Sequence, residues 1–224
     1  VRVDQLPEPG DYLTYTRFGE TALIVRDFNG EIHAFSPICR HRSYPVAQDS
    51  GNCGKCGFAC PYHAWRYRLD GSLAAAPHMQ SGFDPSVWAL PRITTDIWQG
   101  FIFINFDKDA PPLSPQLRTL DKVLEPFGLA NLKCSTMRTK SWPGNWKATL
   151  DNFTEAYHQP SVHPQTFEPW APARKGIYDE VDGPYNLFWL PSADGKDVHT
   201  VWEPLPGLPR KYRTAFIVLN IFPL

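Results

Sequence analysis

Two pairs of potential metal ligands stand out in the first third of the sequence. Cys39 and His41 form one pair, and Cys60 and His63 form the other after eighteen intervening residues. A structural zinc site usually takes two cysteines from one loop and two histidines from the other, whereas each loop here supplies one of each. The set suits a [2Fe–2S] cluster in which Cys39 and Cys60 hold one iron and His41 and His63 hold the other. Imidazoles in place of two thiolates raise the reduction potential above that of an all-cysteine cluster.

A second group of potential ligands lies further along the chain. Glu155, His158 and His163 follow Asn152 closely in a stretch with few helix breakers. The sequence predicts one helix over residues 144–158, which would place Glu155 and His158 on one face. Pro160 is expected to disrupt that helix, so that His158 and His163 can converge on one ion. Two histidines with one carboxylate are the usual protein ligands of non-haem Fe(II), with positions left open for O₂ and substrate.

The two groups together resemble the alpha subunit, or large terminal oxygenase subunit, of the Rieske non-haem iron ring-hydroxylating oxygenases. The C-x-H and C-P-Y-H motifs, followed by Trp65, resemble the Rieske domain of that family. The segment N-W-K…D-N-F-x-E-x-Y-H-x-x-x-x-H-P at residues 145–164 resembles its iron-binding helix. The resemblance covers about residues 10–165 in the family's order.

The resemblance implies two cofactors, a [2Fe–2S] cluster and a mononuclear Fe(II). It places His158 and His163 as iron ligands and Asn152 near that iron. It places Glu155 where an acidic side chain links, across a subunit boundary, to a cluster histidine of the neighbouring subunit. The family's third iron ligand is an Asp on a C-terminal helix, which we expect downstream of Leu224. The chain stops within the apolar run 216–222, so we interpret the sequence as incomplete at its C-terminal end. Four acidic residues after the motif are left unassigned: Asp179, Asp182, Asp194 and Asp197.

The resemblance also implies an activity and its partners. We expect the oxygenase component of a multicomponent system that takes electrons from NAD(P)H through a separate reductase, with or without a ferredoxin. The chain has no G-x-G-x-x-G stretch and is not expected to bind the nicotinamide itself. We expect a homotrimer, either alone or with a small beta subunit.

The expected reaction is dioxygenation or monooxygenation of an aromatic compound, as in aromatic hydrocarbon catabolism. A quaternary ammonium, methoxy or N-methyl substrate is the alternative, because aromatic side chains can also hold a cation by cation–π contacts. The candidate pocket aromatics are Phe167, Trp170, Tyr178, Tyr185, Phe188 and Trp189.

Two hypotheses from other classes stay open. A Rieske-type electron carrier without catalysis would need only the first ligand group. A zinc-stabilised binding module would use Cys39, Cys53, Cys56 and Cys60, and would leave both loop histidines without a role. The C-x-x-C formed by Cys53 and Cys56 is otherwise interpreted as two free thiols, with no role assigned. Metal content discriminates among the three hypotheses.

The predicted fold class is α+β. A small all-β domain over residues 1–112 is expected to present the two ligand loops at one tip, followed by a catalytic domain over 113–224. That second domain is expected to be α+β with an antiparallel sheet of the helix-grip type. The turn signals Asn29-Gly30 and Asp70-Gly71 mark hairpins, and Pro111, Pro112 and Pro115 mark a linker. The predicted strands are 21–26, 31–35, 65–69, 73–75, 93–106 as a pair, 137–142 and 216–222, and a helix is predicted over 116–127. The apolar run 101–104 within the strand pair is expected to be buried.

Composition narrows the function further. The chain has 224 residues and a net charge of −1 from mixed charges, so neither nucleic acid nor membrane is an expected partner. It has no apolar run long enough for a membrane span and no signal peptide pattern, and we expect a cytoplasmic protein.

Overall fold

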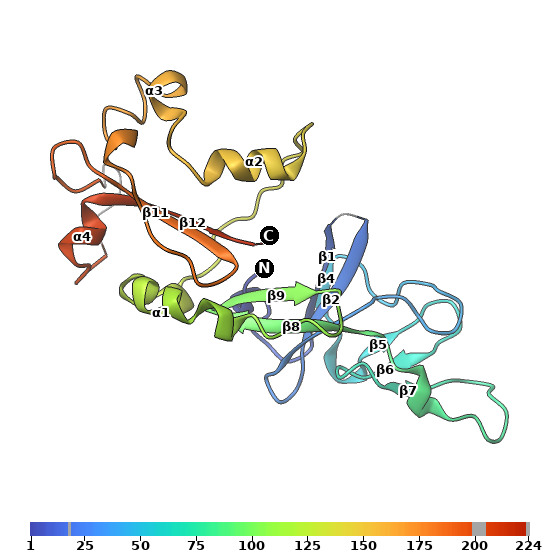
Figure 1. Cartoon of the computed structure of the whole chain (residues 1–224). Coiled ribbons are helices and arrows are strands. Elements are labelled where there is room, and N and C mark those ends of the chain that lie inside the picture. Colours follow the sequence, from blue (N-terminus) through green and yellow to red (C-terminus); the bar gives the residue numbers. More distant parts are fainter. Residues whose placement is uncertain (18, 199–204, 223–224) are drawn as a thin grey trace. The chain divides into compact units, whose positions relative to one another are not determined.

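The computed structural model of the chain describes residues 1–17, 19–198 and 205–222 (Figure 1). The chain divides into two compact units. The first unit comprises Val1–Pro112 with Ala130–Ser135, and the second comprises Leu113–Leu129 with Thr136–Leu224. The short segment 130–135 therefore belongs to the first unit. No local pattern in the sequence predicts this assignment.

The first unit is built on a six-stranded sheet in the order β4-β1-β2-β3-β8-β9. All neighbouring strands are antiparallel. The central strand β2 is buried on both faces, because Leu23 and Val25 enter one core while Ala22 and Ile24 enter another. The strands of this sheet are β1 (Asp11–Arg17), β2 (Glu20–Arg26), β3 (Ile32–Phe35), β4 (Ser50–Asn52), β8 (Arg92–Trp98) and β9 (Phe101–Asn105).

A three-stranded sheet carries the second ligand loop of the first unit. It consists of β5 (Phe58–Ala59), β6 (Arg66–Tyr67) and β7 (Leu73–Ala75). Side chains alternate along β6, so Trp65 and Tyr67 are buried while Arg66 is exposed. Gly57 precedes β5 with φ +66°, and a Cβ there would lie 2.2 Å from the carbonyl oxygen of Tyr67. Only glycine allows this close approach. The unit also contains the short 3₁₀ helices η1 (Val3–Gln5), η2 (Gly54–Cys56) and η3 (Pro85–Trp88).

The second unit contains a three-stranded antiparallel sheet in the order β10-β11-β12 with short helices. Its strands are β10 (Ile177–Tyr178), β11 (Tyr185–Pro191) and β12 (Ala215–Ile221). Its α-helices are α1 (Arg118–Leu124), α2 (Trp146–Phe153), α3 (Gln159–Val162) and α4 (Arg210–Arg213). Its 3₁₀ helices are η4 (Ser114–Leu117), η5 (Glu125–Phe127) and η7 (Ala173–Lys175). A further 3₁₀ helix, η6 (Leu129–Asn131), spans the boundary at which the chain passes from the second unit to segment 130–135 of the first.

The structure confirms the predicted α+β class, with an all-β first unit and an antiparallel sheet in the second. The hairpins at Gly30 and Gly71 are confirmed, and both glycines have positive φ. The helix predicted over 116–127 forms as α1 flanked by two 3₁₀ turns, and it stops at Gly128 with φ +56°. Among the described residues, no helix combines the length and apolar character that crossing a bilayer requires.

Three local predictions are wrong. The segment 137–142 forms no strand and is fully exposed, so its β propensity has no cross-strand neighbour to pack against. The segment 101–104 is a strand, but only Ile102 in it is buried. The helix predicted over 144–158 begins at Trp146 after the Asn145 cap and already ends at Phe153.

Candidate metal centres

The two ligand loops of the first unit are closed by the same backbone pattern. The amide of Cys39 donates to the carbonyl of Tyr44 at 2.9 Å, and the amide of Cys60 donates to the carbonyl of Trp65 at 2.8 Å. Each cysteine carbonyl also accepts from the residue four positions later, Ser43 or Ala64. Both of these residues have a positive φ, of 55° and 60°, which turns the chain back sharply. Each loop is therefore a tight, self-closed turn that fixes its own ligands.

The structure brings the loop histidines together and buries the loop cysteines. Cys39 and Cys60 are 2% and 3% exposed. The rings of His41 and His63 have centroids 4.5 Å apart and are inclined at 70°. His41 also stacks on the buried Trp65, with centroids 4.9 Å apart and planes at 6°. Thiolates therefore lie inside and imidazoles nearer the surface, which matches a two-iron cluster with one inner and one outer iron.

One further observation supports a [2Fe–2S] cluster at these residues. The Nδ1 atom of His41 is buried and has no hydrogen-bond partner among the described residues, as expected of a nitrogen that bonds to a metal. In the described part of the chain, no group of three or more His, Cys, Asp or Glu side chains is placed to hold a single ion. A Rieske-type cluster does not need one, because each iron takes only two protein ligands.

Tyr67 is a site residue that the sequence analysis missed. Its hydroxyl lies 3.3 Å from the Cys39 Sγ and accepts from the Arg40 amide at 3.0 Å, so it is oriented to donate to the sulfur. Burial and the contact with Cys39 raise the pKa of Tyr67 well above its usual range, which keeps the hydroxyl protonated. Burial and the neighbouring His41 lower the pKa of His63, which favours the neutral ring that a metal requires.

The structure does not bring the four cysteines of the zinc hypothesis together. Cys53 precedes η2 and Cys56 is its last residue, and neither belongs to a metal-holding group in the residues that the structure describes. The Cys53 thiol donates to the Gly10 carbonyl at 3.2 Å, and burial raises its pKa. Cys56 is exposed.

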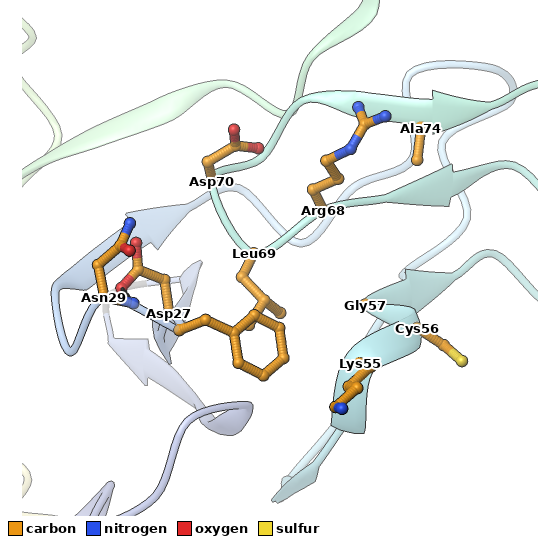
Figure 2. A pocket seen from close by; sticks show the side chains of 10 residues that line it. Asp27, Asn29, Lys55, Cys56, Gly57, Arg68, Leu69, Asp70 and Ala74 are labelled. Carbon is orange, nitrogen blue, oxygen red and sulfur yellow. Dashed lines mark hydrogen bonds between the residues drawn. The ribbon is translucent and has the colours of Figure 1, made fainter.

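A hollow of about 410 Å³ in the first unit contains none of the candidate cluster ligands (Figure 2). Its wall combines Lys55 and Arg68 with Asp27 and Asp70, and the Cys56 sulfur points away from its centre in Figure 2. The buried Asp27 carboxylate is already satisfied, because it accepts from two turn amides and from the ring of His33. This hollow is therefore separate from the cluster loops.

The second ligand group lies around α3 rather than on one long helix. Thr154 caps the end of α2, and Glu155 follows in the connecting segment. His158 and His163 are the residues immediately before and after the four-residue α3, and their ring centroids are 5.5 Å apart. The two rings lie close together as expected, but the cause differs from the predicted one. Pro160 lies in the first turn of α3, where its missing N–H costs nothing, and it does not break an existing helix.

Glu155 holds His158 by two hydrogen bonds. One carboxylate oxygen lies 2.5 Å from the ring Nδ1, and the other accepts from the His158 amide at 3.2 Å. Burial alone would raise the pKa of Glu155, but these bonds lower it below its usual value. With Nδ1 engaged, Nε2 of His158 is the nitrogen left for a metal.

The other candidate residues of the second unit, Asn152 and the four unassigned aspartates, have no recorded contact with His158 or His163 in the described structure. Asn152 is exposed on α2. Each unassigned Asp already has a partner: Asp179 accepts from Trp189, Asp182 from Thr119 and Tyr185, Asp194 from Lys196, and Asp197 pairs with Arg213. Within the described residues, no third His, Cys, Asp or Glu side chain is placed to hold an ion together with His158 and His163.

The six candidate pocket aromatics separate into two kinds. Tyr185 and Phe188 are buried in the core, and Phe167 packs against Phe216 with centroids 4.8 Å apart. Trp170 and Tyr178 are more than half exposed. Trp189 donates its indole N–H to Asp179 at 2.7 Å.

Comparison with known proteins settles the family. Residues 1–95 match the Rieske [2Fe-2S] domain, and residues 129–224 match the catalytic domain of the ring hydroxylating alpha subunit. The chain belongs to the Rieske oxygenases. Similar curated proteins include the glycine betaine monooxygenase oxygenase subunit of Pseudomonas aeruginosa, 34% identical over 163 residues. The carnitine monooxygenase oxygenase subunit of Escherichia coli is 35% identical over 164 residues.

These alignments cover 72% and 71% of this chain, but 38% and 44% of the relatives. The chain therefore spans less than half the length of these Rieske oxygenases. Among solved structures, a quaternary ammonium Rieske monooxygenase superimposes with a TM-score of 0.80 at 26% identity, over 99% of this chain and 57% of that one. Naphthalene 1,2-dioxygenase from Rhodococcus sp. superimposes with a TM-score of 0.73 at 27% identity, over the same shares.

Proposed function

We propose that this chain is part of the terminal oxygenase component of a Rieske monooxygenase that acts on a quaternary ammonium compound. The observation that carries the proposal is the likeness to oxygenase subunits named for glycine betaine and carnitine, at 34% and 35% identity. The relatives thus favour the alternative substrate class over the aromatic compound that we expected from the sequence.

The proposal assigns protein ligands to the cluster and to the mononuclear iron. Cys39 and Cys60 hold one iron of the cluster, His41 and His63 hold the other, and His158 and His163 hold the mononuclear iron. When bound, the cluster supplies electrons one at a time and the mononuclear iron provides the place where O₂ is activated.

The chain's own residues orient and support these ligands. Tyr67 donates to the Cys39 sulfur, and Trp65 stacks on the His41 ring. Glu155 fixes the tautomer of His158, so that Nε2 faces the metal.

The partners are part of the proposal. Electrons would come from NAD(P)H through a separate reductase, with or without a ferredoxin. Glu155 is the residue that we propose to link His158 to a cluster histidine of a neighbouring subunit in a homotrimer. Its direct contact with His158 supports one half of that link.

Substrate recognition follows from the chemistry of the cation. A quaternary ammonium group has no N–H to donate, so a protein holds it by aromatic faces and negative charge. Trp170 and Tyr178 are exposed aromatic side chains of the second unit that could supply such faces in the intact protein.

The test is turnover of the intact protein with its reductase, measured as substrate-dependent consumption of NAD(P)H and O₂. Each quaternary ammonium compound is paired with its neutral isostere, in which carbon replaces the charged nitrogen, and an aromatic hydrocarbon is included. We expect turnover with the cation only, and one ¹⁸O atom from ¹⁸O₂ in the oxidised products. Turnover of the hydrocarbon with two ¹⁸O atoms in the product would refute the proposed substrate class.

A further inference from the structure

Gln159 occupies an unusual place between the two candidate iron ligands. It is the first residue of α3, directly after His158 and one helical turn before His163. The amide of His163 donates to the Gln159 carbonyl at 2.8 Å, which fixes the two residues in helical register. At about 100° per residue, Gln159 lies roughly 100° and His163 roughly 140° around the axis from His158. Gln159 is therefore closer in helical angle to His163 than to His158.

Burial of Gln159 is the second unusual feature. The residue is 7% exposed, whereas Pro160, Ser161 and Val162 in the same short helix are exposed. Its Oε1 atom is buried and accepts no hydrogen bond from any residue that the structure describes. A buried amide oxygen without a donor is uncommon in folded proteins and calls for a partner.

His163 lacks the support that His158 has. Glu155 accepts from Nδ1 of His158, whereas no described residue hydrogen-bonds to the ring of His163. Histidines that bind metals through one nitrogen almost always donate the other N–H to an acceptor. Among the described residues, a buried acceptor without a donor thus lies one helical turn before an exposed ring that has no protein acceptor.

We propose that Gln159 is a positioning residue for His163, which accepts the Nδ1–H of that ring at Oε1 and leaves Nε2 for the mononuclear iron. The two groups are not hydrogen-bonded in this structure, so the proposed contact requires a change of side-chain rotamer. The inference rests on the proposed function, since it assigns His163 to that iron. It gives the two histidines unequal supports, a carboxylate for His158 and a neutral amide for His163.

The test measures Fe(II) binding to the intact protein by anaerobic equilibrium dialysis, with cluster iron counted separately from its visible absorption. Gln159→Met removes the acceptor and keeps an unbranched side chain of similar length. Gln159→Glu keeps an acceptor at the same place. Gln165→Leu is the matched control, because Gln165 is an exposed glutamine close to the same motif.

We expect Gln159→Met to weaken Fe(II) binding about 10- to 100-fold, the usual effect of losing a support behind a metal ligand. Gln159→Glu should bind at least as tightly as the wild type, and Gln165→Leu should be unchanged. The EPR spectrum of the nitric oxide adduct of the bound Fe(II) should change in the Met variant and be restored in the Glu variant. A merely structural role of Gln159 would not produce that restoration.

Two results would overturn the inference alone: wild-type Fe(II) affinity in Gln159→Met, or a Glu variant as weak as the Met variant. If the Met variant fails to fold, the affinity of the Glu variant decides the matter by itself. Failure of the proposed function looks different, because the wild type would then bind no iron beyond the cluster.

Discussion

Replacing Tyr67 by Phe should lower the reduction potential of the cluster. The Tyr67 hydroxyl accepts from the Arg40 amide and lies 3.3 Å from the Cys39 Sγ, so its proton is directed at the sulfur. Reduction adds negative charge to the cluster and strengthens that hydrogen bond. The hydroxyl therefore stabilises the reduced form more than the oxidised form, and its removal makes reduction harder.

The magnitude follows from the energy of a hydrogen bond to a charged group, which is about 1.5–3 kcal/mol. If about half of this energy is gained on reduction, the two oxidation states differ by roughly 0.8–1.5 kcal/mol. For one electron, about 59 mV corresponds to a tenfold change in the equilibrium constant, or about 1.4 kcal/mol. The potential of Tyr67→Phe should therefore be about 30–65 mV more negative than that of the wild type.

The assay is a redox titration of the purified protein, followed by the visible absorption of the cluster. Tyr62→Phe is the matched control, because Tyr62 lies in the ligand loop of Cys60 and His63, is 56% exposed and directs no hydroxyl to a cysteine in the described structure. Its potential should stay within about 10 mV of the wild-type value, well below the roughly 30 mV derived above. An unchanged potential in Tyr67→Phe, with the cluster fully loaded, would refute the assignment of Cys39 as an iron ligand next to this hydroxyl.

Other substitutions test the remaining parts of the site and fold. His158→Ala should remove the mononuclear iron and all turnover but leave the EPR spectrum of the reduced cluster intact; loss of the cluster would contradict the two-centre assignment. Asp27→Asn should cost about 1–3 kcal/mol in denaturant unfolding at pH 7, because hydrogen bonds that lower the pKa of Asp27 despite its burial are weakened. A carboxylate whose pKa is lower in the folded state stabilises the fold above its unfolded pKa, and this contribution is lost as the pH falls through the folded value. The difference between Asp27→Asn and wild type should therefore shrink below about pH 4, and an equal difference at pH 7 and pH 3 would exclude the carboxylate as its source. Gly57→Ala should lower the melting temperature far more than Gly54→Ala, because both have positive φ but only at Gly57 would a Cβ meet backbone, the Tyr67 carbonyl. Equal losses in the two variants would show that the close approach is unimportant.

The candidate ligands can be picked out from the sequence because they lie in the same short segments as the turns that hold them, and their binding of metal stays a prediction. The closeness of His158 and His163 was expected from a helix break at Pro160, which is not its cause. Residues 144–158 contain few helix breakers, but Thr154 ends the helix by donating its hydroxyl to the Asp151 carbonyl. Tyr67 was missed because its partner Cys39 is 28 residues away, and no local pattern reports such a contact.

Contacts between residues near in sequence and contacts between residues distant in sequence have different roles at the two candidate metal centres. Cys39 and Cys60 are fixed by backbone bonds that span only four or five residues, and His158 and His163 by a single turn of helix. Contacts distant in sequence contribute something else, which is the chemical environment of the ligands. A change inside a ligand loop should therefore remove a metal, whereas a change at a distant partner such as Tyr67 should leave the metal bound and alter its potential. A Tyr67→Phe protein that lost its cluster altogether would contradict this division.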